Sequence, residues 1–369
     1  MKREVSQSPF FSIVVPCCNV ARYLDEMAAS VKAQSFADWE CILSCEDSTD
    51  GTLAACEALV KSDPRFVLVK GPRSGSASAA RNRGLDVARG RYAFWLDGDD
   101  FLAEGSLALI AQSVAGQQEP CDLVLGAGWE FLEDAEGRRT DVGHRFNFPP
   151  DVDGCVFSGP ETLVRLSQVD YIWPMPALYV CRVDYLREKG LRFLDGRNGE
   201  DDEWVPRIVA LARRVLVLEK DFYFYRHRAG SVTTTVKELD RWRQYAEVVR
   251  SHIFFFTSQA FPDEVLVAAA HYYLSRFFEA YWLRTEAKIS PFALAFARTR
   301  CLRRILEKGG RAALWKLSAR ASLPKRVGAA LLMVAGIHPI LDLPANVYFG
   351  LYYQIIIWRV RRRGNGDRS

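Results

Sequence analysis

The stretch from residue 92 to residue 100 constrains the fold of this 369-residue chain more than any other. It reads Tyr-Ala-Phe-Trp-Leu-Asp-Gly-Asp-Asp, so an apolar run leads directly into Asp97, Asp99 and Asp100. An unbroken run of aromatic and aliphatic residues is typical of a strand covered on both faces, as in a parallel sheet. The carboxylates would then lie at the carboxyl end of that strand, where open α/β sheets bind their ligands.

Gly98 predicts a sharp turn that brings Asp97 and Asp99 toward one point, because glycine adopts backbone conformations that other residues avoid. Converging carboxylates repel one another unless a cation lies between them, and a hard divalent ion suits oxygen ligands. Taken alone, the motif is also compatible with a strand followed by an acidic turn that binds nothing.

Three earlier apolar segments are each followed by polar loops and helical patterns. They are Ser12–Pro16, Trp39–Ser44 and Phe66–Val69. Strands and helices that alternate in this way predict an α/β fold, a mixed but mainly parallel sheet with right-handed crossovers and flanking helices. The polar loops after the first, second and fourth strands are expected to open on one edge of this sheet.

Several longer motifs occur in a fixed order over about the first 235 residues. They are Ile13-Val-Val-Pro16 with Asn19, Ser48-Thr-Asp-Gly-Thr52, Ser78-Ala-Ala-Arg-Asn-Arg-Gly84, Leu96-Asp-Gly-Asp-Asp100, Leu191-Arg-Phe193 with Glu200-Asp201, and Tyr225-Arg-His-Arg228 with Gly230-Ser-Val-Thr233. As a set they resemble the family 2 glycosyltransferases, which have the Rossmann-like GT-A fold. The resemblance implies transfer of a sugar from a nucleotide-diphosphate donor, usually with inversion at the anomeric carbon.

The resemblance assigns most of these residues to the donor. It implies that Asp99 binds a divalent metal, Mn²⁺ or Mg²⁺, and that Asp97 contacts the ribose or a metal-bound water. Such an ion would neutralise the charge that develops on the nucleoside diphosphate as it leaves. The remaining donor-binding candidates are Pro16, Asn19, Glu46, Ser48, Arg81, Arg226 and Arg228.

The arginines have two possible roles. A guanidinium at Arg81 could hold the diphosphate or the base; the alternative is a solvated helix residue. Arg226 and Arg228 follow Phe222–Tyr225, a predicted edge strand, and with His227 they could close over the diphosphate. Simple solvent exposure of this loop is the alternative.

The catalytic base is expected in a glycine-containing acidic loop that runs from Asp195 to Glu203. An inverting transfer needs one carboxylate to take the proton of the attacking hydroxyl. The resemblance gives this role to Asp201, with Glu200 or Asp202 beside it. The alternative is that these acids only cap the next helix, since acidic residues are favoured in a first turn.

One departure from the family pattern concerns the nucleotide base. The family usually has paired aspartates before Ser-Thr-Asp, and one of them reads the base. Here those positions hold Cys45 and Glu46. A non-standard donor and a weakened enzyme both remain open from the sequence.

Residues from about 130 to 200 are expected to carry the acceptor side, with Trp173 and Asp202 as the acceptor-binding candidates. Trp173 lies in an aromatic and proline-rich stretch, and aromatic faces often stack on sugar rings. Burial of this cluster in the core is the alternative.

Composition sets the wider frame. The nine cysteines are scattered through apolar segments, which predicts reduced, buried thiols in a cytoplasmic protein. The first residues lack an apolar segment long enough for a signal peptide. We expect a catalytic domain over residues 1–235, a helical packing segment over 236–296 and a separate tail over 297–369.

The tail combines strong positive charge with two uncharged stretches. Residues 297–369 hold 15 arginines and lysines against three acids. Within them, residues 327–341 and 343–358 carry no charged side chain but are short for a spanning helix. This pattern favours an in-plane anchor on an anionic membrane surface. Packing in water and a true span are alternatives, and the basic segment has no nucleic-acid-binding motif.

The sequence thus predicts a metal-dependent, inverting glycosyltransferase of hexosyltransferase type, peripheral on the inner face of the cell membrane. Its acceptor would be a glycan or a lipid-linked sugar in cell-surface polysaccharide assembly. One alternative is a nucleotidyltransferase, in which the loop of Glu200 and Asp201 would have no clear function. The other is a catalytically silent protein that binds nucleotide sugars.

Overall fold

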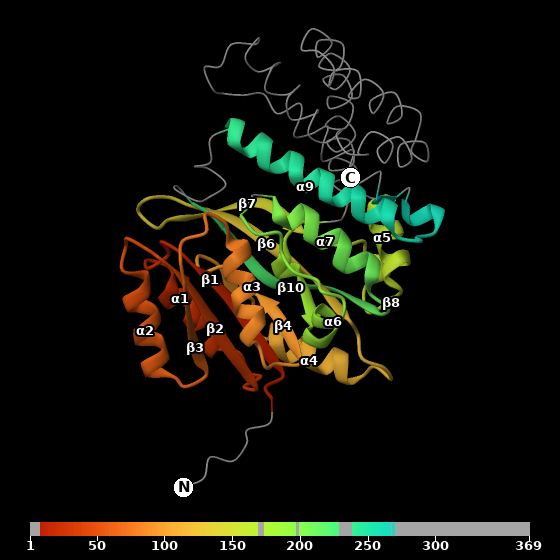
Figure 1. The fold of residues 1–369 in the computed structure, drawn as a ribbon. Helices are drawn as coiled ribbons and strands as arrows, with labels where there is room; N and C mark the ends of the chain where they lie inside the picture. The colour runs from red at the N-terminus through yellow and green to blue at the C-terminus, as the bar shows by residue number, and fades with distance from the viewer. Residues whose placement is uncertain (1–7, 169–172, 197–198, 229–237, 267, 270–369) are drawn as a thin grey trace. The chain divides into compact units, whose positions relative to one another are not determined.

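The computed structural model describes residues 8–168, 173–196, 199–228, 238–266 and 268–269. The chain divides into two compact units, Met1–Thr235 and Val236–Ser369. Figure 1 shows the first unit as a sheet with helices on its faces.

The first unit alternates strands and helices over its N-terminal half and becomes mixed afterwards. Its strands are β1 (Phe11–Cys17), β2 (Trp39–Glu46), β3 (Phe66–Gly71), β4 (Tyr92–Trp95), β5 (Phe101–Leu102), β6 (Leu123–Glu133), β7 (Arg139–Phe146), β8 (Val156–Phe157), β9 (Tyr179–Arg182) and β10 (Val215–His227). Its helices are α1 (Leu24–Lys32), α2 (Thr52–Ser62), α3 (Ala77–Val87), α4 (Ser106–Ala115), α5 (Gly159–Gln168), α6 (Val183–Glu188) and α7 (Glu200–Leu211), with short 3₁₀ turns η1 (Pro150–Val152) and η2 (Pro176–Leu178).

All ten strands belong to one sheet, in the order β3-β2-β1-β4-β9-β6-β10-β5, with β7 on β6 and β8 on β10. The first four strands of this order are parallel, and β6 and β10 also pair in parallel. Strand β9 joins the two parallel groups through antiparallel pairs. The order reverses between β1 and β4, and such a switch point is where ligands bind in sheets of this kind. The predicted α/β fold with flanking helices is confirmed.

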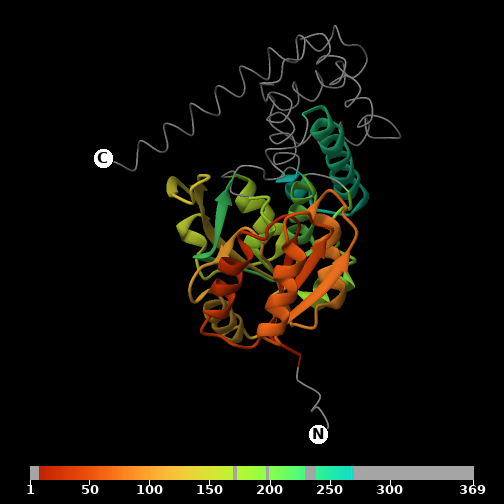
Figure 2. The ribbon, with the colours of Figure 1, turned by 90° about the vertical axis from the view of Figure 1, so that its left-hand side faces the viewer.

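Helices α2 and α3 cover opposite faces of the β1–β2 region, and both lie along this part of the sheet in Figures 1 and 2. Helix α3 packs on the face that carries Val14, where a Cβ at Gly84 would lie 2.3 Å from Val14 Cγ1. Glycine is therefore needed at residue 84 for this close contact. Helix α2 packs on the other face, where the thiol of Cys56 meets those of Cys17 and Cys45.

The prediction of an edge strand at Phe222–Tyr225 is wrong. These residues belong to β10, which has β6 on one side and β5 and β8 on the other. Phe222 and Tyr223 are completely buried. The partners of β10 come from distant parts of the chain, so the local sequence does not reveal them. The spacing of β10 against β6 is also irregular, with register shifts between Val217 and Tyr223.

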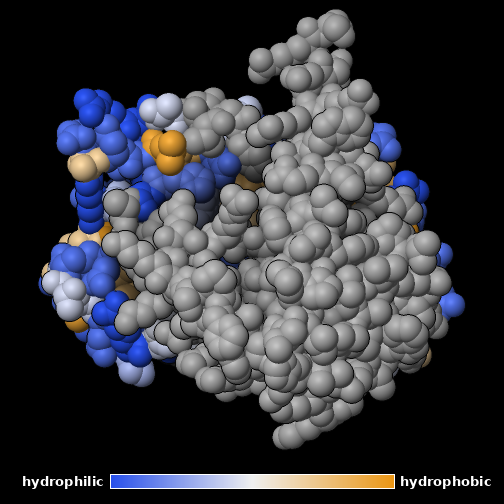
Figure 3. All heavy atoms as spheres, turned by 90° about the horizontal axis from the view of Figure 1, so that it is seen from above, coloured by the Kyte–Doolittle hydropathy of each residue, from blue (hydrophilic) through white to orange (hydrophobic). Residues whose placement is uncertain are grey.

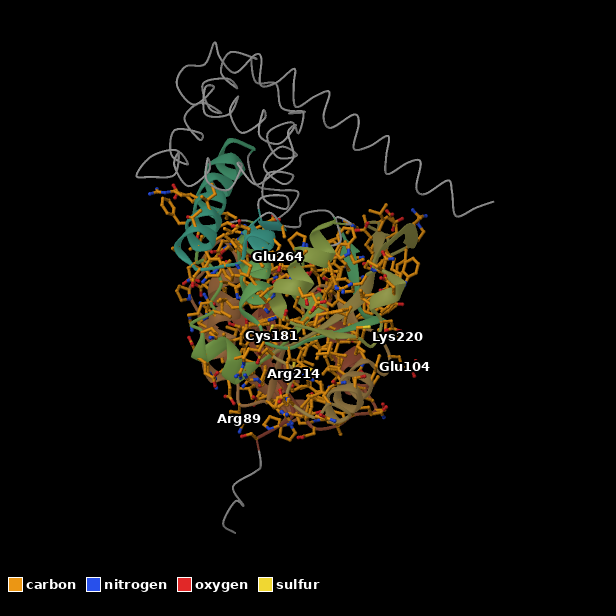
Figure 4. All side chains as sticks on the ribbon, turned by 90° about the vertical axis from the view of Figure 1, so that its right-hand side faces the viewer. Arg89, Glu104, Cys181, Arg214, Lys220 and Glu264 are labelled. Atoms are coloured by element: carbon orange, nitrogen blue, oxygen red, sulfur yellow. The ribbon has the colours of Figure 1, made fainter. Side chains whose placement is uncertain are left out.

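The predicted burial of the cysteines agrees with the structure. Eight cysteines are described and all are free thiols, six of them buried. Figure 4 shows Cys181, on β9, in the interior of the first unit, with Arg89, Glu104 and Lys220 toward its periphery.

Figure 3 shows a few apolar residues among hydrophilic ones where the atoms are not grey. Single apolar residues of this kind are ordinary on a protein surface.

In the second unit, the structure describes helix α9 (Glu238–Ser258) and a short following stretch. Its buried residues include Val248, Ile253 and Phe256. No helix within the described ranges is both long and apolar enough to cross a membrane. The basic tail over 297–369, and the boundary expected at residue 296, lie outside the described residues.

Candidate active site

Asn19, Ser48 and Thr49 tie together the loops that follow β1 and β2. Asn19 has a left-handed backbone, with φ 54°, which asparagine tolerates better than most residues. Its Oδ1 accepts a hydrogen bond from the Thr49 backbone N at 2.9 Å, and its own backbone N donates to Ser48 Oγ at 3.3 Å. Pro16 lies near the end of β1, opposite Ser44 of β2. The candidates Pro16, Asn19 and Ser48 therefore lie at one edge of the sheet.

Glu46, at the end of β2, is buried and bonded within the protein. Its Oε1 accepts hydrogen bonds from Arg83 Nη2 and Ser74 Oγ, both at 2.8 Å, and its Oε2 accepts one from Ser74 N at 2.9 Å. The adjacent Cys45 is also buried, which raises the pKa of its thiol to about 12. Glu46 thus fastens β2 to the loop before α3, and a role toward the nucleotide base stays a prediction.

The turn after β4 is formed by Asp97 to Asp100 and is closed by a hydrogen bond from Asp100 N to Asp97 O, at 3.1 Å. Each predicted metal ligand is bonded to one arginine. Asp97 Oδ1 accepts from Arg81 Nη2 at 2.9 Å, and Asp99 Oδ2 accepts from Arg228 Nε at 2.7 Å. The Asp97 and Asp99 side chains are 31% and 20% exposed, so both carboxylates remain accessible from solvent.

Glycine is needed at residue 98 because a Cβ would be too close to its neighbours, and not because of the backbone conformation. Its φ is not positive, so the expected reason for this glycine is wrong. A Cβ at this position would lie 2.9 Å from Val20 Cγ2 and 3.2 Å from Pro16 O. The turn therefore packs directly against the loop that follows β1.

Arg81, on α3, joins the turn after β4 to the start of α7. Its Nη1 donates hydrogen bonds to Glu200 Oε1 at 3.3 Å and to Asp201 Oδ1 at 3.1 Å, while Nη2 reaches Asp97. The side chain is only 5% exposed. Burial by itself lowers the pKa of Arg81, but the carboxylates of Asp97, Asp201 and Glu200 raise it overall. The alternative of a solvated Arg81 is therefore wrong, because the guanidinium is enclosed by three acids.

The acids that we expected in a loop form the first turn of α7 instead. The helix begins at Glu200, and Gly199, with φ 81°, ends the loop just before it. The positive end of the helix dipole favours carboxylates at these positions. Asp202 lies in the same turn and is half-buried.

The electrostatics of Asp201 suit a general base. Burial and the neighbouring Glu200 raise the pKa of Asp201 well above its usual value, and Arg81 opposes this rise. Burial also raises the pKa of Glu200, again against Arg81. A carboxylate with a raised pKa transfers protons more effectively near neutral pH.

An aromatic cluster fastens α7 to β4. Trp204, on α7, stacks on Phe193 with ring centroids 4.2 Å apart and meets Trp95 of β4 edge-on at 5.5 Å. Asn82 of α3 holds the same segment, because its side chain exchanges hydrogen bonds with the backbone O and N of Phe193 at 2.9 and 3.0 Å. These contacts connect the helix that carries Asp201 to the strand that leads into Asp97.

Arg226 and Arg228 have different environments. Every guanidinium nitrogen of Arg226 is bonded inside the protein: Nε to Asp99 O at 2.6 Å, Nη2 to Glu26 at 2.7 Å and Nη1 to Glu133. Its side chain is 1% exposed, so solvent exposure is wrong for Arg226. Arg228 is 14% exposed and bonds Asp99. Donor contact by either arginine stays a prediction.

The described residues contain no group of three histidine, cysteine, aspartate or glutamate side chains arranged to hold a metal ion. Asp97 and Asp99 nevertheless offer carboxylate oxygens, the donors that Mn²⁺ and Mg²⁺ prefer. Burial and the adjacent Asp97 raise the pKa of Asp99, and Arg228 opposes this rise. Binding of a divalent cation by these two carboxylates stays a prediction.

The sequence and the fold are similar to those of known proteins. Residues 12–149 match the family model described as Glycosyl transferase family 2. These residues form a family 2 glycosyltransferase domain. Its fold is similar to the crystal structure of S. aureus TarS 1–349 in complex with UDP-GlcNAc, with a TM-score of 0.68 and 19% identity over 93% of this chain and 91% of that chain. The GT-A fold predicted from the sequence is confirmed.

Two relatives illustrate the range of proteins that share this glycosyltransferase domain. Glycosyltransferase GlyG of Streptococcus pneumoniae is 27% identical over 252 residues, which are 67% of this chain and 80% of GlyG. The minor teichoic acid biosynthesis protein GgaB of Bacillus subtilis is 28% identical over 246 residues. That match covers 65% of this chain but only 26% of GgaB.

The two acceptor candidates lie in different parts of the chain. Trp173 packs edge-on against Phe146 of β7, with centroids 5.3 Å apart, and its Nε1 donates to Asn147 O at 3.0 Å. Asp202 lies on α7, next to Asp201 in sequence. The roles of Trp173 and Asp202 toward an acceptor stay predictions.

Asp100 and Tyr223 lie beside the candidate site, although neither was predicted as a site residue. Asp100 is the third acid of the motif, and it is 1% exposed while Tyr223 is fully buried. The Tyr223 hydroxyl donates a hydrogen bond to Asp100 Oδ2. The third aspartate was visible in the sequence, but its partner on β10 is 123 residues away and has no local signal.

Proposed function

We propose that this protein is an inverting, metal-dependent glycosyltransferase that moves a sugar from a nucleotide-diphosphate donor to an acceptor hydroxyl. The observation that carries the proposal is the position of Arg81. One guanidinium bonds Asp97, a proposed donor-side residue, and Asp201, the proposed base, at 2.9 and 3.1 Å. The proposed donor side and the proposed base thus meet at a single buried guanidinium.

In this mechanism Asp97 and Asp99 would hold a divalent cation, Mn²⁺ or Mg²⁺, which supplies charge neutralisation to the departing diphosphate. Asp201 takes the proton from the acceptor hydroxyl as that oxygen attacks the anomeric carbon. Arg81 keeps the carboxylate of Asp201 oriented and partly offsets the repulsion between it and Asp97. Attack from the face opposite the leaving group gives inversion.

The donor and acceptor are proposed from the relatives together with the site. TarS binds UDP-GlcNAc in the structure that shares this fold, which supports a nucleotide sugar and makes UDP-hexoses the first donors to assay. GgaB is named for teichoic acid biosynthesis, which supports a glycan or lipid-linked acceptor in cell-surface polysaccharide assembly. Binding of the acceptor by Trp173 and Asp202 is part of the proposal.

The decisive experiment compares the wild type with Asp201→Asn in the full-length protein. We expect Asp201→Asn to reduce sugar transfer about 10²- to 10⁴-fold, because it removes the general base, while donor binding measured by calorimetry is retained. Asp184→Asn, in the first turn of α6, is the control and should keep full transfer. The anomeric configuration of the product, read by NMR, tests inversion.

Two outcomes would contradict the proposal. Equal turnover by wild type and Asp201→Asn would remove Asp201 from the mechanism. Donor binding by the wild type without transfer to any of a panel of glycan and lipid-linked acceptors would favour a catalytically silent binding protein.

We further propose that the basic tail over 297–369 brings the enzyme to the inner face of the cell membrane. The support is its composition, 15 arginines and lysines against three acids with two uncharged stretches between them. Cationic segments are attracted to anionic lipid headgroups, and short apolar segments between them add binding within the interface.

A further inference from the structure

The end of strand β10 holds the turn from Asp97 to Asp100 in place through several hydrogen bonds. Arg226 N donates to Asp100 Oδ1 at 2.7 Å, and Arg226 Nε donates to Asp99 O at 2.6 Å. Arg228 Nε reaches the Asp99 carboxylate at 2.7 Å. The turn that carries the proposed metal ligands is therefore shaped by a strand far away in the sequence.

Asp100 cannot serve as a third ligand in this arrangement. One carboxylate oxygen accepts the Arg226 backbone N–H and the other accepts the Tyr223 hydroxyl. The residue is 1% exposed, so it does not open toward a bound diphosphate. Both of its oxygens are committed to β10.

A buried carboxylate beside two others is costly. An apolar residue of similar size would avoid that cost. The presence of a carboxylate here is best explained by what its hydrogen bonds position.

Tyr223 links the two ends of the turn. Its hydroxyl donates to Asp100 Oδ2 and accepts a hydrogen bond from the Asp97 backbone N at 3.4 Å. One hydroxyl thus connects the backbone of the first aspartate to the side chain of the third.

We infer that Tyr223 and Asp100 are positioning residues that set the affinity of Asp97 and Asp99 for a divalent cation. The inference rests on the proposed function, since it assumes that these two aspartates bind the ion. Neither Tyr223 nor Asp100 touches the ion or the substrate. They act by fixing the backbone from which the ligands project.

The test measures Mn²⁺ binding to the full-length protein by the electron paramagnetic resonance signal of the free ion. Tyr223→Phe keeps the ring and removes only the hydroxyl, and we expect Mn²⁺ to bind about 2- to 13-fold more weakly, the scale of one buried hydrogen bond. The transfer rate at saturating Mn²⁺ should return close to that of the wild type. General damage to the fold would not be repaired by more Mn²⁺.

Matched controls come from two other buried tyrosines. Tyr92 and Tyr185 donate hydroxyl hydrogen bonds to the backbone oxygens of Cys121 and Ile208, away from the turn. Tyr92→Phe and Tyr185→Phe should leave the Mn²⁺ affinity unchanged although they also remove a buried hydrogen bond. A loss of Mn²⁺ affinity in these controls equal to that in Tyr223→Phe would overturn the inference.

Asp100→Asn provides a second variant that separates positioning from ligation. It keeps the shape of the side chain but weakens one of its two hydrogen bonds, so Mn²⁺ binding should weaken without being lost. Asp99→Asn should abolish binding. If Asp100→Asn also abolishes binding, Asp100 is a ligand and the inference is overturned.

Two further outcomes distinguish this inference from the proposed function. Wild-type Mn²⁺ affinity in Tyr223→Phe overturns the inference but leaves the proposed metal dependence standing. Absence of Mn²⁺ binding by the wild type, in the presence and absence of a nucleoside diphosphate, overturns both.

Discussion

The guanidinium of Arg81 lies 3.1 Å from the carboxylate of Asp201, and the Arg81 side chain is 5% exposed while the Asp201 side chain is 31% exposed. Arg81 is on α3 and Asp201 is on α7, 120 residues apart. This ion pair is therefore a tertiary contact that favours the deprotonated form of the proposed base.

Replacing Arg81 is expected to shift the pH dependence of transfer. The pKa of Asp201 is raised by burial and by Glu200 and is lowered by Arg81. A base works in its deprotonated form, so activity rises as the pH passes upward through this pKa. In the wild type we expect kcat/KM to rise with pH, and the midpoint of this rise should lie at a pH above the usual pKa range of aspartate.

Arg81→Gln removes the influence that lowers the pKa of Asp201, so the limb should move to higher pH. The measurement is kcat/KM against pH at saturating metal. Arg192→Gln, which disrupts an exposed ion pair with Asp86, is the control and should leave the limb in place. A limb that moves to lower pH in Arg81→Gln would contradict this account of the site.

Gly84→Ala should destabilise the protein because its Cβ would lie 2.3 Å from Val14 Cγ1. Overpacking of this kind costs about 1–3 kcal/mol in the free energy of unfolding, measured by urea titration of tryptophan fluorescence. Gly116→Ala is the control, since its nearest contact would be an ordinary 3.6 Å.

The double variant Val14→Ala with Gly84→Ala tests the cause of that loss. It opens the space that the new methyl group needs, so its free energy of unfolding should exceed the value expected from adding the two single losses. Strict additivity would show that the contact with Val14 is not the reason for the glycine.

Truncation of Trp204 should loosen the base from the rest of the site. Trp204→Ala removes the stack on Phe193 and the edge contact with Trp95, and the loss of a buried aromatic side chain costs about 3–5 kcal/mol. Trp129→Ala, at a half-buried position of β6, should cost less. The free energy of unfolding and kcat are measured together, and unchanged kcat in folded Trp204→Ala would contradict the proposed role of this cluster.

Membrane association is tested by sedimentation of the full-length protein with lipid vesicles. We expect binding to vesicles that contain anionic phosphatidylglycerol, reduced by high salt because salt screens the attraction. Pure phosphatidylcholine vesicles are the control and should bind less. Equal binding to both lipids, without a salt effect, would argue against an electrostatic anchor.

The sequence was most informative where one motif encodes one local element. The strand that ends before Asp97 could be predicted because its apolar run and its acids are contiguous. The same holds for the strands at Phe11–Cys17 and Trp39–Glu46. Each reflects burial on both faces of a parallel sheet, which leaves a direct trace in composition.

Contacts between segments that are distant in the sequence could not be predicted from the local composition. The burial of Arg226 depends on Glu26, 200 residues away, and on Glu133. A charged residue after an aromatic run looks exposed unless these partners are known. For the same reason Tyr223 could not be recognised as part of the site. The start of α7 at Glu200 was missed because an acidic stretch after glycine is compatible with both a loop and a first helical turn.

The irregular pairing of β10 with β6 makes the number of residues in β10 important for the site. The register of β10 against β6 shifts between Val217 and Tyr223. Tyr223, which follows these shifts, is hydrogen-bonded to the Asp97–Asp100 turn. Successive residues of a strand face opposite sides, so deleting one residue there would turn the following side chains over. Homologues that keep this edge of the sheet should therefore show very few insertions or deletions between residues 218 and 222.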